Sequence, residues 1–192
     1  MEFKSRMSTF YLSLCALFAA LSAVLSQLAI PIGPVPINMV HISIFMAAGL
    51  LGAKYGTLSQ AVFVLMGIVG IPVFANMGSG FGTLMGPTGG FIVGNLLCTL
   101  VAGLIIDRWG RSVKALVSAM CAGYVATYLF GVSWFMFWSN NLAAAPREEA
   151  LTIVGALVLV MFPFLPGEIL KVAISVVLIR KLFPIVQRRI YQ

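Results

Sequence analysis

The chain has 192 residues, of which 61% are apolar and 9% are charged, and its mean hydropathy is +1.07. Soluble domains usually carry about 25% charged residues, so this composition excludes a water-soluble globular domain. The 12 Lys and Arg residues against 5 Asp and Glu residues give a net charge of +7, and the positions of these residues decide what that charge means.

Long apolar runs recur along the chain and predict six transmembrane helices in a single domain that spans residues 1–192. A membrane-spanning helix needs roughly 20 mostly apolar residues. We expect the helices at residues 9–30, 37–53, 57–70, 89–106, 113–138 and 151–179. The second and third are short for a full crossing, and the sixth is long enough that Pro163 and Pro166 should bend it. The predicted fold class is an all-α integral membrane protein.

The basic residues predict the orientation of these helices, because Lys and Arg near helix ends concentrate on the cytoplasmic side. With six helices and both termini inside, the outer loops are residues 31–37, 71–88 and 139–149, which hold one basic residue, Arg147. Ten of the 12 basic residues then face the cytoplasm, namely Lys4, Arg6, Lys54, Arg108, Arg111, Lys114, Arg180, Lys181, Arg188 and Arg189. A five-helix topology would place a basic cluster outside. We therefore expect a multi-pass protein of the cell membrane with cytoplasmic termini.

Two charges, Glu168 and Lys171, fall within the expected spans, where a charged side chain costs about 2.5–3.5 kcal/mol on insertion scales. Their i, i+3 spacing puts them on one helix face, where they can pair. The pair is either self-neutralising or a ligand site, in which the carboxylate accepts from ligand N–H groups and the ammonium meets a ligand carboxylate. Buried ion pairs often fail to recover their desolvation cost, which favours the ligand site.

The uncharged segment 71–88 is rich in glycine and proline and lies between the third and fourth expected helices. Its apolar side chains argue against disorder, so we expect an ordered outer loop that covers a pocket open to the outside. Glycine permits close approach of the backbone to a ligand. The Gly78-x-Gly80-x-Gly82 pattern lacks the βαβ context of a phosphate-binding loop, and the chain has no Walker A motif, so we expect no ATP hydrolysis by this chain.

Other polar residues in the spans have two interpretations each. The buried amide of Asn95, after Thr88, bonds either a neighbouring helix or a ligand. His41 is the one histidine, and without further ligands a packing role is favoured over a metal site. The three cysteines lie in spans without metal-binding spacing, so we expect neither a metal site nor a disulfide framework. Tyr124, deeper in the fifth span, is a candidate to face the pocket.

Two small-x3-small patterns, Ala16/Ala20 and Ala19/Ala23, occur in the first span and allow close helix approach. Spacing alone favours packing within this subunit over a smooth external surface for a partner protein.

Together these motifs resemble the BioY family, the biotin-specific substrate-binding subunits of energy-coupling-factor vitamin transporters. The resemblance covers about residues 10 to 182, and its most specific parts are residues 33–37, 70–90 and 165–171. It implies a six-helix membrane protein of prokaryotes that binds biotin near the outer face. It also implies a transmembrane coupling protein and two cytoplasmic ATPases as partners, with neither a cofactor nor a nucleic acid.

The resemblance also implies roles for individual residues. Lys171 matches the family lysine, and Glu168 replaces the aspartate more usual in the Pro-Gly-Asp motif, which lengthens the acceptor arm. The Ala16-x3-Ala20 pattern matches the motif by which these subunits contact the coupling protein. Glu168 and Asn95 suit the ureido edge of biotin, and Lys171 suits its carboxylate or ureido oxygen. The candidate binding residues are Glu168, Lys171, Asn95, Thr88, Gly82, Phe81, Phe74, Gly90 and Tyr124.

Three other functions remain open at this point. One is a subunit for another vitamin, of the riboflavin or thiamine class, and another is an ion channel that uses Glu168 and Lys171. The third is an intramembrane enzyme, which needs a nucleophile and a base, yet Ser79 is the one serine in the glycine-rich segment and His41 the one histidine. We therefore expect a transporter subunit and not an enzyme.

Overall fold

Helices make up most of the structure, a computed structural model that describes residues 2–31, 35–143 and 150–190. The long helices are α1 (Glu2–Gln27), α2 (Val40–Ile68), α4 (Gly89–Trp109), α5 (Val113–Asn141) and α7 (Leu165–Ile190). The shorter elements are β1 (Ala29–Ile30), β2 (Ile37–Asn38), η1 (Ala75–Met77), α3 (Phe81–Met85), α6 (Ile153–Val160) and η2 (Phe162–Phe164). The strands β1 and β2 pair in antiparallel register, Ala29 with Asn38 and Ile30 with Ile37.

Within the described residues, five helical segments are long and apolar enough to cross a membrane. They are Thr9–Gln27, Val40–Ile68, Gly89–Trp109, Val113–Asn141 and Ile153–Arg188. The predicted helical membrane architecture is thus confirmed, but the predicted number of six helices is not. The helices expected at 37–53 and 57–70 are two arms of the single element α2.

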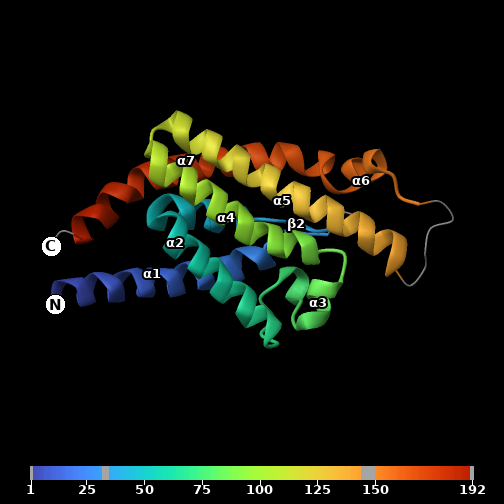
Figure 1. Cartoon of the computed structure of the whole chain (residues 1–192), viewed down its shortest axis with the longest axis horizontal. Helices are drawn as coiled ribbons and strands as arrows, with labels where there is room; N and C mark the ends of the chain where they lie inside the picture. Colours follow the sequence, from blue (N-terminus) through green and yellow to red (C-terminus); the bar gives the residue numbers. More distant parts are fainter. Residues whose placement is uncertain (1, 32–34, 144–149, 191–192) are drawn as a thin grey trace.

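The two arms of α2 meet at Gly52, whose backbone is not helical (φ 75°, ψ −173°). A residue with positive φ cannot continue a right-handed helix, and glycine adopts this conformation without steric cost. The chain turns back on itself here, since the position of a Cβ at Gly56 would lie 3.0 Å from the carbonyl oxygen of Ala47. Figure 1 shows the resulting corner in α2. The sequence prediction places the break at residues 54–56, between the two expected helices, and not at Gly52.

The last predicted span is interrupted, as the two prolines indicated. Helix α6 ends at Val160, the short helix η2 contains Pro163, and α7 begins at Leu165 with Pro166 in its first turn. Proline lacks a backbone N–H, so it fits the first turn of a helix without loss, whereas in the interior it removes a hydrogen bond and bends or ends the helix. The bend brings the start of α7 next to the interior of the protein, where its first polar residues lie.

The segment 71–88 contains the short helices η1 and α3, so it has more secondary structure than the predicted loop. The end of α1 holds its first half: Gln27 Nε2 donates to the carbonyl oxygen of Phe74 at 2.9 Å, and Gln27 Oε1 accepts from the backbone N–H of Met77 at 3.1 Å. Ser26 also donates to the carbonyl oxygen of Val73. These contacts fix a segment in which Asn76 and Met77 have positive φ.

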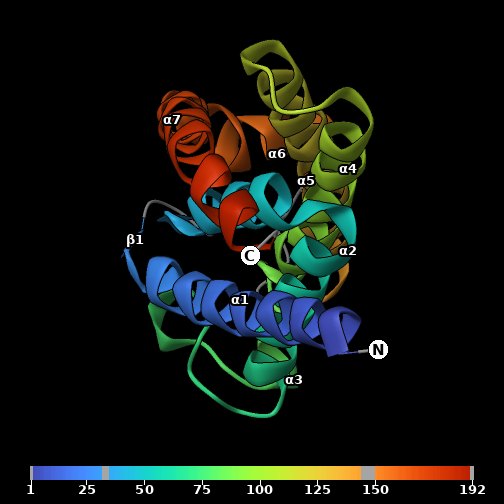
Figure 2. The ribbon, with the colours of Figure 1, turned by 90° about the vertical axis from the view of Figure 1, so that its left-hand side faces the viewer.

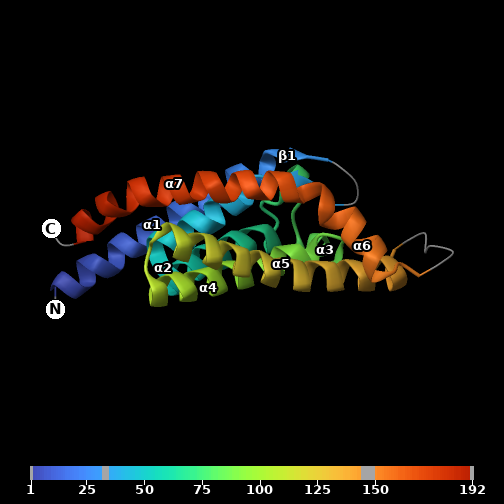
Figure 3. The same cartoon turned by 90° about the horizontal axis from the view of Figure 1, so that it is seen from above.

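The arrangement of the helices places both ends of the described chain together. The start of α1 and the end of α7 lie at one end of the molecule, and the α4–α5 turn lies toward that end (Figure 1). Figure 2, a view along the long axis, shows α2 between α1 and α7. Seen from above, α7 runs along one side and α4 and α5 along the other (Figure 3). The first arm of α2 is therefore the central helix, and all its residues from Ser43 to Gly52 are buried.

Helices α4 and α5 pack closely because small residues line their contact. A Cβ on Gly94 would lie 3.0 Å from the carbonyl oxygen of Thr127, and one on Gly123 would lie 2.8 Å from the Sγ of Cys98. Small residues at such crossings let helix backbones approach in a membrane, where apolar side chains gain little by leaving lipid. Large exposed apolar residues such as Leu129 and Ile169 lie on the outside, as expected for a surface that faces lipid.

Candidate functional site

A cavity of about 270 Å³ lies between the first arm of α2, α4, α5, α7 and the segment around η1. Its lining residues are Ser26, Val35, Pro36, Asn38, Val40, His41, Phe63, Phe74, Ala75, Asn76, Thr83, Thr88, Phe91, Ile92, Asn95, Thr127, Tyr128, Val160, Phe164, Glu168 and Lys171. This combination of many apolar and a few polar groups is typical of small-molecule sites.

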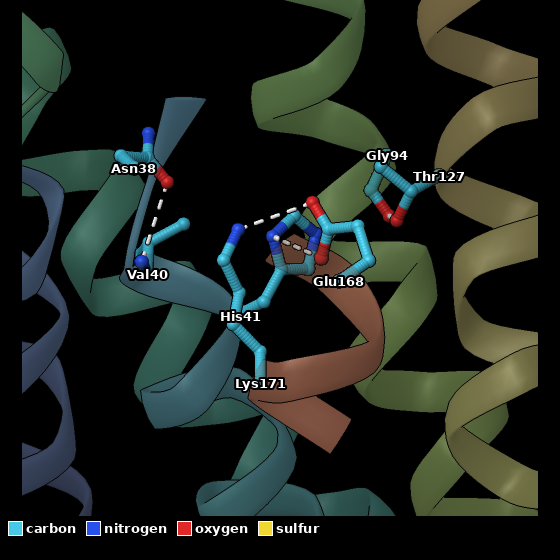
Figure 4. A network of polar contacts seen from close by, with 7 residues as sticks. All are labelled: Asn38, Val40, His41, Gly94, Thr127, Glu168 and Lys171. Atoms are coloured by element: carbon cyan, nitrogen blue, oxygen red, sulfur yellow. Dashed lines mark hydrogen bonds and ion pairs between the residues drawn. The ribbon is translucent and has the colours of Figure 1, made fainter. Parts of the chain in front are cut away.

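The charged pair of the sequence lies in the wall of this cavity. Lys171 Nζ donates to Glu168 Oε1 at 3.1 Å, and the two side chains are 2% and 7% exposed. Both residues lie in the first two turns of α7, directly after the bend at η2, so one helical turn brings their side chains together. Figure 4 shows the ammonium and the carboxylate facing one another. The pair leaves the second carboxylate oxygen, Oε2, without a hydrogen bond among the described residues.

His41 lies next to this charged pair. The interpretation of His41 as a packing histidine did not predict this position. Its Nδ1 lies 3.9 Å from Glu168 Oε2 (Figure 4). The ring also packs at 4.8 Å from the ring of Tyr124 and at 6.0 Å from that of Phe45, measured between centroids. An ionisable residue inside a membrane span is by itself a signal of a functional site, and that signal applied to His41.

Several buried polar atoms near the cavity have no hydrogen-bond partner among the described residues. They are both ring nitrogens of His41, Asn95 Oδ1, Tyr124 OH and Glu168 Oε2. Buried polar groups in proteins are almost always hydrogen-bonded, and each exception needs an explanation. Two of these atoms, Asn95 Oδ1 and Glu168 Oε2, are acceptors on side chains that line the cavity. Both oxygens can therefore accept hydrogen bonds from a molecule in the cavity.

Two other polar side chains at the cavity are held by the backbone. Asn38 Oδ1 accepts from the N–H of Val40 at 3.2 Å, at the start of α2, and Thr127 Oγ1 donates to the carbonyl oxygen of Gly94 at 3.3 Å (Figure 4). These bonds fix the two ends of the polar cluster, on α2 and between α4 and α5. The sequence prediction did not single out either residue, although both are polar in otherwise apolar segments.

The structure brings together five of the nine predicted binding residues. Glu168, Lys171, Asn95, Thr88 and Phe74 all line the cavity. Phe74 is 2% exposed and packs edge-to-face on Phe63, with ring centroids 5.7 Å apart. Both halves of the segment 71–88 thus contribute to the cavity wall.

The other four predicted residues lie outside the cavity lining. Phe81 is 61% exposed, and the neighbouring Gly82 is exposed as well. Gly90 packs against Trp134, whose Cβ would be 2.2 Å from a Cβ at this position. Tyr124 lies behind His41 and lines an adjoining apolar cavity between α5, α6 and α7.

The two alanine patterns of α1 face opposite directions. Ala16 and Ala20 are exposed, whereas Ala19 is buried at 1% exposure and belongs to the main core. The Ala16/Ala20 stripe is thus free of packing within the described part of this chain. The position is compatible with a surface for another protein.

The sequence profile of the BioY family matches residues 2–188. The chain belongs to the BioY family. The resemblance carried by the motifs at residues 33–37, 70–90 and 165–171 is thereby confirmed. In this BioY-family chain, the last of these motifs supplies the buried Glu168–Lys171 pair, and the second supplies Phe74 and Thr88 of the cavity wall.

Individual relatives agree with the family. The chain is 36% identical over 171 residues to the probable biotin transporter BioY of Pyrococcus horikoshii, covering 88% of this chain and 94% of that one. It is 39% identical over 129 residues to the biotin transporter BioY of Thermotoga maritima, covering 67% and 76%. It also resembles a crystal structure described as the S-component for biotin from an ECF-type ABC transporter, with a TM-score of 0.81, 28% identity and coverage of 92% of both chains.

Proposed function

We propose that this chain is the high-affinity biotin-binding subunit of an ATP-driven energy-coupling-factor importer. Membership of the BioY family and similarity to an S-component for biotin support the ligand and the type of transporter. The chain would capture biotin from outside and close the segment 71–88 over it. Reorientation of the subunit, driven by a transmembrane coupling protein and two cytoplasmic ATPases, would then release biotin inside.

The cavity itself is the observation that carries the assignment to biotin. Biotin has a ureido ring with two N–H donors and one carbonyl acceptor, and a carboxylate on an apolar chain. Glu168 Oε2 and Asn95 Oδ1 are buried acceptors without partners among the described residues, and they can accept from the two N–H donors. Lys171 offers a charged donor, and aromatic side chains such as Phe74 and Phe91 offer apolar walls. Riboflavin and thiamine have larger or cationic rings, so they suit this cavity less well.

Binding of biotin to the purified protein tests the proposal. We expect titration in detergent to give a Kd in the nanomolar range, with no competition from riboflavin or thiamine at a hundredfold excess. Competition by biotin methyl ester, which keeps the ureido ring but has no free carboxylate, measures how much of the affinity depends on the carboxylate end of biotin. An analogue methylated on both ureido nitrogens should fail to compete, because it has no N–H donors. Absence of biotin binding up to micromolar concentrations would refute the assignment.

The location of the termini in the cytoplasm is part of the proposal. The start of α1 and the end of α7 lie at the same end of the molecule, which requires an even number of crossings (Figure 1). Five helical segments give six crossings if the two arms of α2 cross the membrane in opposite directions, as the break at Gly52 implies. The six crossings then place Lys54, Arg108 and Arg111 at the cytoplasmic end, in agreement with the positive-inside rule.

Labelling of single cysteines tests this topology. In a background without the three native cysteines, Met77→Cys should react with a membrane-impermeant maleimide in intact cells, because Met77 is 68% exposed in the outer segment. Lys54→Cys, at the break in α2, should react only after permeabilisation. Labelling of Lys54→Cys in intact cells would contradict the cytoplasmic position of the break.

A further inference from the structure

The position of the His41 imidazole indicates a role in the binding site. The residue lines the cavity, and neither ring nitrogen has a hydrogen-bond partner among the described residues. The aromatic rings of Tyr124 and Phe45 hold the imidazole from the sides. A histidine that served packing alone would be expected to bond a backbone carbonyl or a neighbouring side chain.

The role of His41 follows from its distance to the Glu168 carboxylate. Glu168 Oε1 already accepts from Lys171 Nζ at 3.1 Å, and Glu168 Oε2 lies 3.9 Å from His41 Nδ1. A hydrogen bond between Nδ1 and Oε2 needs an approach of about 1 Å, because N–H···O bonds measure about 2.9 Å. A small change in the side-chain torsion angles of Glu168 can close this distance without a ligand. Two donors on separate helices, α2 and α7, would then hold the two oxygens of one carboxylate.

We propose that His41 is a positioning residue of the binding site, whose Nδ1–H holds Glu168 Oε2 while Lys171 holds Glu168 Oε1. This inference rests on the proposed function and deepens it. A carboxylate oxygen accepts more than one hydrogen bond, so both oxygens remain able to accept from ligand N–H groups. Fixed at both oxygens, the carboxylate has one orientation, and the ordering is completed before the ligand binds. Preorganisation of this kind raises affinity without a new contact to the ligand.

Two nearly isosteric substitutions separate hydrogen bonding from packing. The amide nitrogen of Asn reaches about the position of Nδ1, whereas Leu has the same shape as Asn but no polar atom. We expect His41→Leu to raise the Kd for biotin at least tenfold and His41→Asn to remain within about threefold of the wild type. Equal losses for Asn and Leu would assign His41 to packing and overturn the proposal. Normal binding by His41→Leu would overturn it as well.

A double-mutant cycle with Glu168 tests whether the effect runs through the carboxylate. In a Glu168→Gln background the charged acceptor is gone, so His41→Leu should change the Kd by less than threefold. A tenfold loss in both backgrounds would contradict a positioning role for His41 toward Glu168. Ser175→Ala is the matched control, since Ser175 on α7 is also buried without a hydrogen-bond partner among the described residues, but lies outside the cavity lining. Its Kd should equal that of the wild type.

The wild-type titration keeps the two proposals distinguishable. If the wild-type chain fails to bind biotin, the proposed function falls, and the role of His41 falls with it. If the wild-type chain binds biotin and His41→Leu binds equally well, only the role of His41 falls. Thermal unfolding without ligand, measured for each variant, establishes that a lost affinity reflects the site and not an unfolded protein.

Discussion

The carboxylate of Asp107, near the end of α4, accepts a hydrogen bond from the backbone N–H of Ala53, with 2.8 Å between the nitrogen and Oδ2. Ala53 is the first residue after the break in α2 at Gly52. The first N–H groups of a helix have no partner within that helix, and negative charge is favoured there. Asp107 therefore caps a helix that lies 54 residues away in the sequence.

A basic residue completes the arrangement on the other side of the break. Arg111 Nε donates to the carbonyl oxygen of Gly49 at 2.7 Å, in the last turn of the first arm of α2, where a cation is favoured. Its guanidinium also lies 4.0 Å from the centroid of the Phe183 ring on α7. Burial lowers the pKa of Arg111 from its ordinary value, and the Asp107 carboxylate opposes this shift. The α4–α5 corner thus holds both arms of α2 and contacts α7.

Removal of the Asp107 carboxylate should loosen the corner of α2. We expect Asp107→Ala to lower the free energy of unfolding by about 0.5–2 kcal/mol, the usual cost of losing a helix cap. Asp107→Asn keeps an acceptor oxygen, so it should lose less. Thermal unfolding in detergent measures both. Equal midpoints for the wild type and Asp107→Ala would contradict the capping role.

A methyl group at Gly52 should destabilise the protein more than one at another glycine with positive φ. At Gly52 (φ 75°) the added Cβ would lie 2.5 Å from Asp107 Oδ1, so Gly52→Ala loses the cap and gains a steric clash. At Gly70 (φ 102°) nothing lies within 4 Å, so Gly70→Ala has only the backbone cost of about 1–2 kcal/mol. We expect a clearly lower unfolding midpoint for Gly52→Ala. Equal midpoints would show that the clash is relieved without cost.

Lys171 is expected to affect both stability and binding. Lys171→Met leaves the buried Glu168 carboxylate without its ammonium partner, which costs about 3–5 kcal/mol in comparable buried pairs. The double variant Lys171→Met with Glu168→Gln removes the unpaired charge and should recover most of the unfolding midpoint. Biotin binding should stay at least a hundredfold weaker in both. Recovery of binding in the double variant would remove these two residues from the site.

Gln27 is expected to slow the escape of biotin, because its amide holds the backbone at Phe74 and Met77 over the cavity. Gln27→Leu keeps the size of the side chain and removes both hydrogen bonds. We expect a three- to tenfold faster dissociation of biotin with a nearly unchanged association rate. Leu28→Gln, at the next position in the sequence, where the side chain is exposed, is the control. Identical dissociation rates for Gln27→Leu and the wild type would contradict this role.

The exposed alanine stripe of α1 predicts a separation of transport from binding. Ala20→Trp should abolish assembly with the coupling protein and biotin uptake by cells, because a large side chain prevents close helix approach. The Kd of the purified subunit for biotin should not change. Leu104→Trp, at another exposed position, on α4, should leave uptake intact. Normal uptake by both Ala16→Trp and Ala20→Trp would exclude this stripe as the partner surface.

The predicted helix positions agree with the structure where hydrophobicity alone decides them. The spans at 89–106 and 113–138 match α4 and α5, and the bend at Pro163 and Pro166 appears between α6 and α7. Apolar length and a missing backbone N–H are local properties, so they can be read from neighbouring residues. The charge of Lys54 placed a break between the helices predicted at 37–53 and 57–70. Sequence reasoning did not place it at Gly52 itself, since Asp107 and Arg111, which hold the break, are distant in the sequence.

The binding site shows the same division. Glu168 and Lys171 were recognised because a charge in a membrane span is costly wherever it lies. His41 was not recognised as their neighbour, and Phe81 and Gly82 were expected in a cavity that they do not line. The direction of a side chain in a loop depends on the conformation of the loop backbone. That conformation depends on contacts with distant residues, such as those of Gln27 with the backbone of Phe74 and Met77.

By itself the sequence determined that this is a helical membrane protein of the BioY family, which residues are charged inside the membrane, and where proline interrupts the last span. These properties follow from composition, local geometry and short motifs. Only the tertiary structure decided that the turn in α2 lies at Gly52 and is held by Asp107 and Arg111, and that His41 lies beside Glu168. Such relationships depend on the packing of helices that are far apart in the chain, and no short stretch of sequence contains both partners.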